Sequence, residues 1–117
     1  MDFEIIRKEG HSVIKVLSNK LDTNNAPELK SELVVLGNES VRNIILDISE
    51  CKYVDSSGLS AILVANRLCE DAIGTFILTG LQPDVEHLIR ISMLHTVLLI
   101  TKTVDEAEQL LEQKGKL

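Results

Sequence analysis

The fold is decided by the stretch NIILDISECKYVDSSGLSAIL, residues 43–63. Its first six residues, 43–48, are almost all apolar, which is typical of a strand covered on both faces. Apolar residues then recur at Leu59, Ile62, Leu63 and Leu68, and their spacing predicts a helix over residues 57–70. Asp55-Ser56-Ser57-Gly58 lies between strand and helix, at the carboxyl end of the strand, where open α/β sheets usually carry their sites.

Two short apolar runs at the start of the chain predict a β-hairpin. They cover residues 3–8 and 13–18, and Gly10 between them supplies the backbone freedom that a tight turn needs. Asn25 is then the expected N-cap of a helix, which we expect to end at residues 37–38.

After the central helix, strands and helices alternate to the end of the chain. We expect strands at 75–79 and 97–100, a short helix opened by Pro83 and a terminal helix opened by Thr103. Such alternation implies right-handed crossovers between parallel strands, which leaves only the hairpin antiparallel. The sequence therefore predicts a single α/β domain over residues 1–117, with a mixed, mostly parallel sheet of about five strands and about four helices.

Composition narrows the classes of function. The net charge of -6 disfavours nucleic acid and anionic membranes as partners, and the lack of Trp, with one Tyr and two Phe, removes the stacking platform of a single-strand binder. No signal peptide or membrane-length apolar run is evident, and the spacing of Cys51 and Cys69 fits neither a zinc site nor a disulfide framework. We therefore expect a cytoplasmic protein without metal or cofactor that binds another protein.

Three interpretations of Asp55-Ser56-Ser57-Gly58 are open on local sequence. The first is a plain helix N-cap, because Ser and Asp are preferred there and Gly permits the turn. The second is a phosphate acceptor, because a helix N-terminus tolerates an added anion. A nucleophilic serine is disfavoured: the flanks do not form Gly-x-Ser-x-Gly, and the histidines, His11, His87 and His95, are explained by turn or helix surfaces. We therefore expect no enzyme.

The loop Leu21-Asp22-Thr23-Asn24-Asn25 is a second candidate, because it also follows a strand and opens a helix. If the two preceding strands are neighbours, this loop lies beside Ser56. Asp22 and Asp55 would then form an acidic cluster that attracts an arginine of a partner protein.

Together these features resemble the STAS domain family, which sulfate transporters share with anti-sigma factor antagonists. The resemblance is carried by residues 43–63, by Leu21-Asp22 with the helix after it, and by Ile91-Ser92-Met93-Leu94. The chain length resembles a stand-alone bacterial antagonist. The resemblance implies that Ser56 is phosphorylated by a serine kinase that is itself an anti-sigma factor. Unphosphorylated antagonist would bind this kinase and release a sigma factor, and a PP2C-type phosphatase would reset the modified form.

The resemblance also implies roles for the residues around Ser56. Asp22 matches an acidic loop residue that contacts the partner, while Ser57 and Gly58 match positions that shape the phosphoacceptor loop; Asp55 and Leu59 complete the expected contact surface. The main alternative is a non-switching STAS scaffold, a subunit of a sensory or lipid-transport assembly in which Ser56 is only a cap. A serine hydrolase is the remote alternative.

Overall fold

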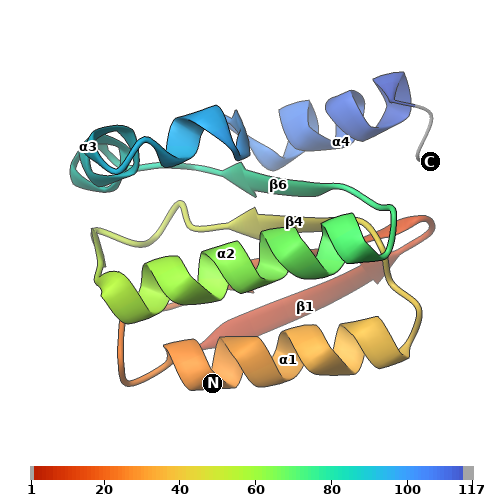
Figure 1. Cartoon of the computed structure of the whole chain (residues 1–117), viewed down its shortest axis with the longest axis horizontal. Coiled ribbons are helices and arrows are strands. Elements are labelled where there is room, and N and C mark those ends of the chain that lie inside the picture. The colour runs from red at the N-terminus through yellow and green to blue at the C-terminus, as the bar shows by residue number, and fades with distance from the viewer. Residues whose placement is uncertain (1, 115–117) are drawn as a thin grey trace.

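The main sheet has five strands in the order β1-β2-β4-β6-β7. The computed structural model describes residues 2–114 (Figure 1), so residues 1 and 115–117 of the predicted domain lie outside the described part. The hairpin strands pair antiparallel and the other strands pair parallel, which confirms the predicted mixed, mostly parallel sheet. The strands are β1 (Phe3–Lys8), β2 (His11–Val16), β4 (Ile44–Asp47), β6 (Phe76–Thr79) and β7 (Leu99–Thr101).

Four α-helices cover the sheet, as predicted. Two of them, α1 (Ala26–Asn38) and α2 (Ser56–Asp71), lie side by side against one face (Figure 1). The core beneath them also includes side chains of α3 (Pro83–Ile91). The opposite face is covered by α4 (Val104–Gln113), which packs on β2, β4 and β6.

The central strand β4 is buried on both faces. Ile44 and Leu46 belong to the core under α1 and α2, whereas Ile45 belongs to the core under α4. Successive side chains of a strand point to opposite faces, so a strand between two helical layers is apolar at nearly every position. This explains the near-continuous apolar run at residues 44–48, which only Asp47 interrupts.

The largest differences between predicted and observed boundaries are in two strands, and the other boundaries agree to within one residue. The second hairpin strand begins at His11 rather than at residue 13, because it pairs with β1 directly after Gly10, whose φ of 87° makes the turn. The last strand begins at Leu99 rather than at residue 97, because the 3-10 helix η1 (Leu94–Thr96) occupies the preceding residues.

The buried stripe of α2 does not include every apolar residue that marked this helix in the sequence. Leu63 and Leu68 are 38% and 36% exposed. The buried side chains follow helical spacing and are mostly small: Gly58, Ala61, Ile62, Ala65 and Cys69. Small side chains let a helix lie close to its neighbours, so the larger leucines are left on the outer face.

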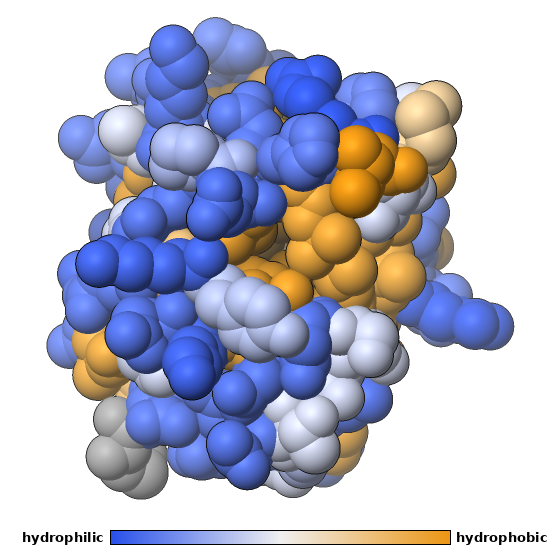
Figure 2. Space-filling view, turned by 90° about the vertical axis from the view of Figure 1, so that its left-hand side faces the viewer, coloured by the Kyte–Doolittle hydropathy of each residue, from blue (hydrophilic) through white to orange (hydrophobic). Residues whose placement is uncertain are grey.

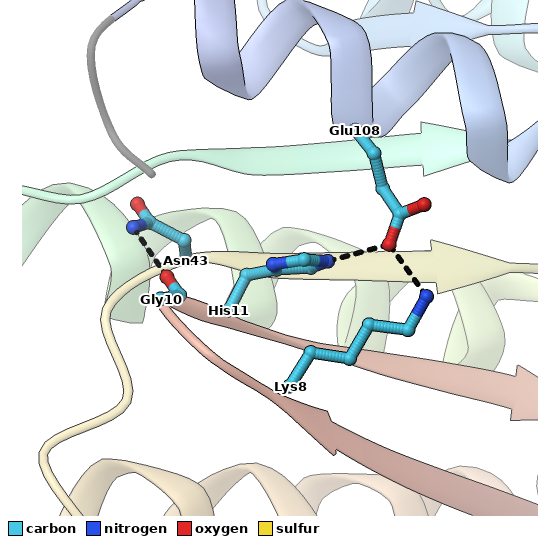
Figure 3. Close-up of polar contacts among 5 residues, drawn as sticks. All are labelled: Lys8, Gly10, His11, Asn43 and Glu108. Atoms are coloured by element: carbon cyan, nitrogen blue, oxygen red, sulfur yellow. Dashed lines mark hydrogen bonds and ion pairs between the residues drawn. The ribbon is translucent and has the colours of Figure 1, made fainter.

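The expectation that His11 lies at a turn surface is wrong. His11 is buried, and its Nε2 lies 2.7 Å from Glu108 Oε2, to which Lys8 Nζ also donates at 2.7 Å (Figure 3). The reason is that α4 packs over this end of β1 and β2 and carries Glu108 inward. These contacts tie the terminal helix to the hairpin.

The end of α2 places a β-branched residue in a left-handed conformation. Gly74, expected to stop this helix, donates its N–H to Cys69 O at 2.7 Å, and Ile73 donates to Glu70 O at 3.0 Å. These two hydrogen bonds form a Schellman motif, in which the residue before the last donor has a positive φ. That residue is Ile73, with φ 58° and 77% of its surface exposed.

We therefore expect Ile73→Gly to raise the free energy of unfolding by about 1 kcal/mol, because glycine adopts positive φ without the steric cost. Urea denaturation measures the change. Gly74→Ala is the matched control and must destabilise, since a Cβ there would lie 1.9 Å from Arg42 O. A less stable Ile73→Gly protein contradicts the assigned conformation.

Candidate functional site

Two short strands bring the two candidate loops together. The strand β3 (Lys20–Leu21) pairs in parallel with β5 (Tyr53–Val54), and neither was predicted. Because their carboxyl ends lie at the same edge, the loop after Leu21 lies beside the start of α2. We expected this loop to lie beside Ser56 if the strands before the two loops were neighbours, and both statements are confirmed.

Thr23 makes the direct contacts between the loops. Its backbone N–H and its hydroxyl both donate to Asp55 Oδ2, each at 3.2 Å. Its Oγ1 also lies 3.2 Å from Ser57 Oγ. The sequence placed Thr23 in the candidate loop without assigning it a role, because only the pairing of β3 with β5 reveals the contact.

Asp55 is the N-cap of α2. Its Oδ1 accepts from the Gly58 N–H at 2.9 Å, while Oδ2 accepts from Thr23. The pKa of Asp55 is lowered, mainly by the hydrogen bond from Gly58 and further by those from Thr23, with desolvation acting in the opposite direction. The carboxyl is therefore a carboxylate at neutral pH that holds two loops at once.

The two serine hydroxyls have different surroundings. Ser57 is half-buried and its hydroxyl is engaged by Thr23. Ser56 is exposed at the first position of α2, and no group among the described residues hydrogen-bonds its hydroxyl. The helix cap is thus supplied by Asp55, and the Ser56 hydroxyl is not needed for it.

Asp22 and Asn25 stabilise the shape of the neighbouring loop. Asp22 Oδ1 accepts from Asn24 N–H at 2.9 Å, and no interaction between Asp22 and Asp55 is present among the described residues. Asn25 begins α1 as predicted, but its side chain does not cap it. The buried Asn25 amide instead accepts from Asp22 N–H at 2.9 Å and donates to Lys20 O at 2.8 Å, because the loop turns back on β3.

Gly58 is required by a close approach of α2 to β3. An added Cβ would lie 2.3 Å from Leu21 O and 2.8 Å from Val54 Cγ1. The first turn of α2 therefore lies against both short strands only because this residue has no side chain. Gly58 thus connects the two loops by packing, as Asp55 and Thr23 do by hydrogen bonds.

An open groove of about 630 Å³ lies beside Ser56, between the start of α2 and α3. Leu59 lines this groove and also packs against the core. Apolar and charged side chains both contribute to the lining: Tyr53, Val54, Val85, Leu88 and Ile91, with Lys52, Asp55, Asp84 and His87. Figure 2 views this end of the molecule and shows an apolar area surrounded by polar surface.

The two cysteines are buried and unreactive, and the described residues hold neither a metal-ligand cluster nor a membrane-spanning helix. Burial raises the pKa of Cys51 and of Cys69 to about 12, so both thiols stay protonated. Within residues 2–114, no group of three His, Cys, Asp or Glu side chains is placed to hold a metal ion. No helix in that range is long and apolar enough to cross a membrane.

Comparison with known families identifies the fold. The sequence model of the STAS domain matches residues 2–107, which include all five strands of the main sheet and both loops of the site. The chain belongs to the STAS domain family. The similarity of this STAS domain to its family is therefore not confined to residues 43–63 but covers nearly the whole chain.

Individual relatives carry related names. The STAS chain is 28% identical over 80 residues to BtrV of Bordetella bronchiseptica, named as a candidate anti-sigma factor antagonist, with 68% of this chain and 69% of BtrV aligned. A Thermotoga maritima structure with a similar name has a TM-score of 0.81 at 24% identity, covering 94% of each chain. Phosphorylated SpoIIAA of Bacillus has a TM-score of 0.73 at 22% identity, covering 93% of this chain and 98% of SpoIIAA.

The packing at Gly58 yields a test of this STAS site. Replacing a helical glycine by alanine ordinarily stabilises a protein by about 0.5–1 kcal/mol. We expect Gly58→Ala to destabilise by about 1–3 kcal/mol, because α2 must move away from Leu21. In the matched control, Gly37→Ala in α1, the added Cβ meets nothing within 4 Å, so a gain in stability is expected. Equal effects in urea denaturation of the two variants contradict the close approach.

The Asp55 carboxylate predicts a dependence of stability on pH. A group whose pKa is lowered on folding contributes stability above its unfolded pKa, and the contribution is lost as pH falls through the folded value. We therefore expect Asp55→Ala to lower the Tm at pH 7, with the difference from wild type shrinking below the ordinary value of 3.8. Asp71→Ala, at the other end of α2, is the charge-matched control. A difference that is constant with pH contradicts the role of the charge.

Proposed function

We propose that this STAS domain is an anti-sigma factor antagonist whose binding to a partner is switched by phosphorylation of Ser56. The observation that carries the proposal is the contrast between neighbouring side chains. Asp55 and Ser57 are engaged by the adjoining loop, whereas Ser56 is exposed and its hydroxyl is not hydrogen-bonded by a described residue. A kinase therefore reaches Ser56 without opening the fold.

The covalent step is an ordinary phosphoryl transfer. The Ser56 Oγ attacks the γ-phosphorus of ATP held by the kinase, the new O–P bond forms as the bond to ADP breaks, and the hydroxyl proton passes to a base of the kinase. Hydrolysis by a PP2C-type phosphatase returns the hydroxyl and releases inorganic phosphate. The STAS chain is the substrate of both steps and supplies no catalytic group.

The surface around Ser56 has the features of a protein-docking site. The groove presents an apolar floor, with Tyr53 and Ile91 53% and 64% exposed, and its rim carries the carboxylates of Asp55 and Asp84. Apolar anchors within a polar rim are typical of binding hot spots, and carboxylates favour a partner arginine. The occupant we propose is the anti-sigma factor kinase, with Asp22 in the adjoining loop as a further contact.

Phosphorylation is expected to change binding without unfolding the domain. A phosphoryl group adds about -1.5 to -2 charges at the N-terminus of α2, where the helix dipole favours an anion by about 0.3–1 kcal/mol. At an interface, the added charge lies beside the Asp55 carboxylate, and Lys30 and Lys52, which line pockets that Ser56 also lines, are the STAS cations available to offset it. Any part of the charge that is buried without a partner costs several kcal/mol, which lowers affinity by orders of magnitude.

The names of the relatives support the same function. BtrV and the Thermotoga maritima protein are named as candidate anti-sigma factor antagonists, and SpoIIAA carries that function and a phosphorylated form in its description. The function that we propose for this chain follows from these names by analogy.

The first test maps phosphate on the protein purified from its native host. We expect one phosphate at Ser56 by mass spectrometry, absent from Ser56→Ala and retained in Ser57→Ala, because only the first hydroxyl is accessible. A chain that stays unmodified under several growth conditions favours the scaffold alternative. Labelling of Ser56 by an active-site phosphonate favours the hydrolase alternative instead.

The second test measures binding to an anti-sigma factor of the serine-kinase class from the same organism. We expect Ser56→Asp to weaken binding by at least about tenfold, because it adds charge inside the interface. Ser60→Asp adds the same charge one turn along α2, where Ser60 is also exposed, and serves as the control. Equal affinities for the wild type and Ser56→Asp contradict the switch.

A further inference from the structure

A second polar cavity lies at the opposite end of the sheet from Ser56. It has a volume of about 290 Å³ and lies between the β1–β2 turn and the loop from α1 to β4. We propose that this cavity binds a small oxyanion, represented by inorganic phosphate. The proposal concerns residues at the amino ends of β2 and β4, so it does not depend on the function proposed for Ser56.

The charge of the lining is opposite to that of the chain. Three basic residues, Arg7, Lys8 and Arg42, line the cavity together with one acidic residue, Glu39, and the Lys8 ammonium is paired with Glu108 of α4. The chain as a whole carries 12 basic and 18 acidic residues. A concentration of cations in a net acidic protein produces a local potential that attracts an anion.

The cavity also contains a buried hydroxyl with no partner. Ser12 is 1% exposed, lines the cavity, and its Oγ makes no hydrogen bond among the described residues. A buried polar group without a partner is costly, and most are satisfied by protein, water or ligand. The Ser12 hydroxyl is therefore a donor available to a bound anion.

The register of the hairpin places Arg7 next to Ser12. The two residues are cross-strand partners, so their side chains lie on the same face of the sheet. Arg7 Nε and Nη2 donate to Glu39 at 2.8 and 3.1 Å, which occupies two of its five N–H groups. Arg42 is exposed and forms no ion pair among the described residues. Two guanidinium groups and a hydroxyl thus surround the cavity.

A second orphaned atom, His11 Nδ1, belongs to the same lining. The other ring nitrogen faces Glu108, which favours a proton on Nε2 and leaves Nδ1 as an acceptor when the ring is neutral. In Figure 3 this unpartnered nitrogen lies on the side of Gly10 and Asn43, which also line the cavity. Consecutive residues of a strand point to opposite faces, so the His11 ring lies on the α4 face and the Ser12 hydroxyl on the face covered by α1, and only Ser12 is assigned to the anion.

The size of the cavity restricts the ligand. Pockets for drug-sized molecules have volumes of about 300–1,000 Å³, so 290 Å³ suits a free oxyanion better than a nucleotide. An ordered water is the competing occupant, because one water also satisfies a buried hydroxyl. Phosphate differs from water in its dependence on the arginines.

The experiment is an NMR titration of the full chain with sodium phosphate, compared with sodium chloride at equal ionic strength. We expect saturable amide shifts in residues 7–12 and 39–43 with a Kd of about 1 mM, the affinity of a few charge-assisted hydrogen bonds. Arg42→Gln is expected to weaken phosphate binding by about tenfold. Arg67→Gln, which removes the same charge from the exposed face of α2, is expected to leave it unchanged.

Ser12→Ala distinguishes a role of the Ser12 hydroxyl in phosphate binding from a purely structural role. Without phosphate the variant should be as stable as the wild type or more so, because it removes an unpaired hydroxyl. With phosphate it should lose most of the ligand-dependent rise in Tm. Indistinguishable shifts in phosphate and chloride, or equal weakening by Arg42→Gln and Arg67→Gln, overturn the proposal and leave water as the occupant. Shifts at these residues with ATP but not with phosphate overturn it in favour of a nucleotide.

Discussion

The burial of β4 on both faces is the constraint on which the rest of this structure depends. A strand with Ile44 and Leu46 under two helices and Ile45 under a third cannot lie at an edge of the sheet or face water. Its parallel pairing with β2 and β6 aligns the carboxyl ends of the three strands. The chain leaving β4 therefore emerges at the same end as the chain leaving β2, and that is where the site forms.

At that end of the sheet, adjacent residues of the loop have different structural roles. Asp55 caps α2 and accepts from Thr23, Ser57 is held by the same threonine, and Gly58 allows the helix to approach Leu21. Each of these residues is held by packing or hydrogen bonds. Ser56 is the position in Asp55–Gly58 whose side chain makes no hydrogen bond among the described residues.

The two ends of the sheet differ in their electrostatics. The Ser56 end presents Asp55 and Asp84 around an apolar groove, whereas the opposite end presents Arg7 and Arg42 around a buried hydroxyl. A partner with basic and apolar groups suits the first end, and a small anion suits the second. The net charge of -6 describes neither end, because it averages over the whole surface.

The sequence by itself determined the alternation of strands and helices, the buried central strand and the position of the Ser56 loop, because these depend on local periodicity and on residues close in the chain. Tertiary structure decided which side chains meet. The β3–β5 pair, the contact of Thr23 with Asp55 and the inward turn of His11 toward Glu108 join residues that are far apart in sequence. The apolar spacing that included Leu63 and Leu68 predicted the helix but not its buried face, since only the packed neighbours of α2 determine which face is buried. Contacts between residues far apart in the chain leave no pattern in the local sequence. One such contact, between Thr23 and Ser57, distinguishes the Ser57 hydroxyl from the Ser56 hydroxyl.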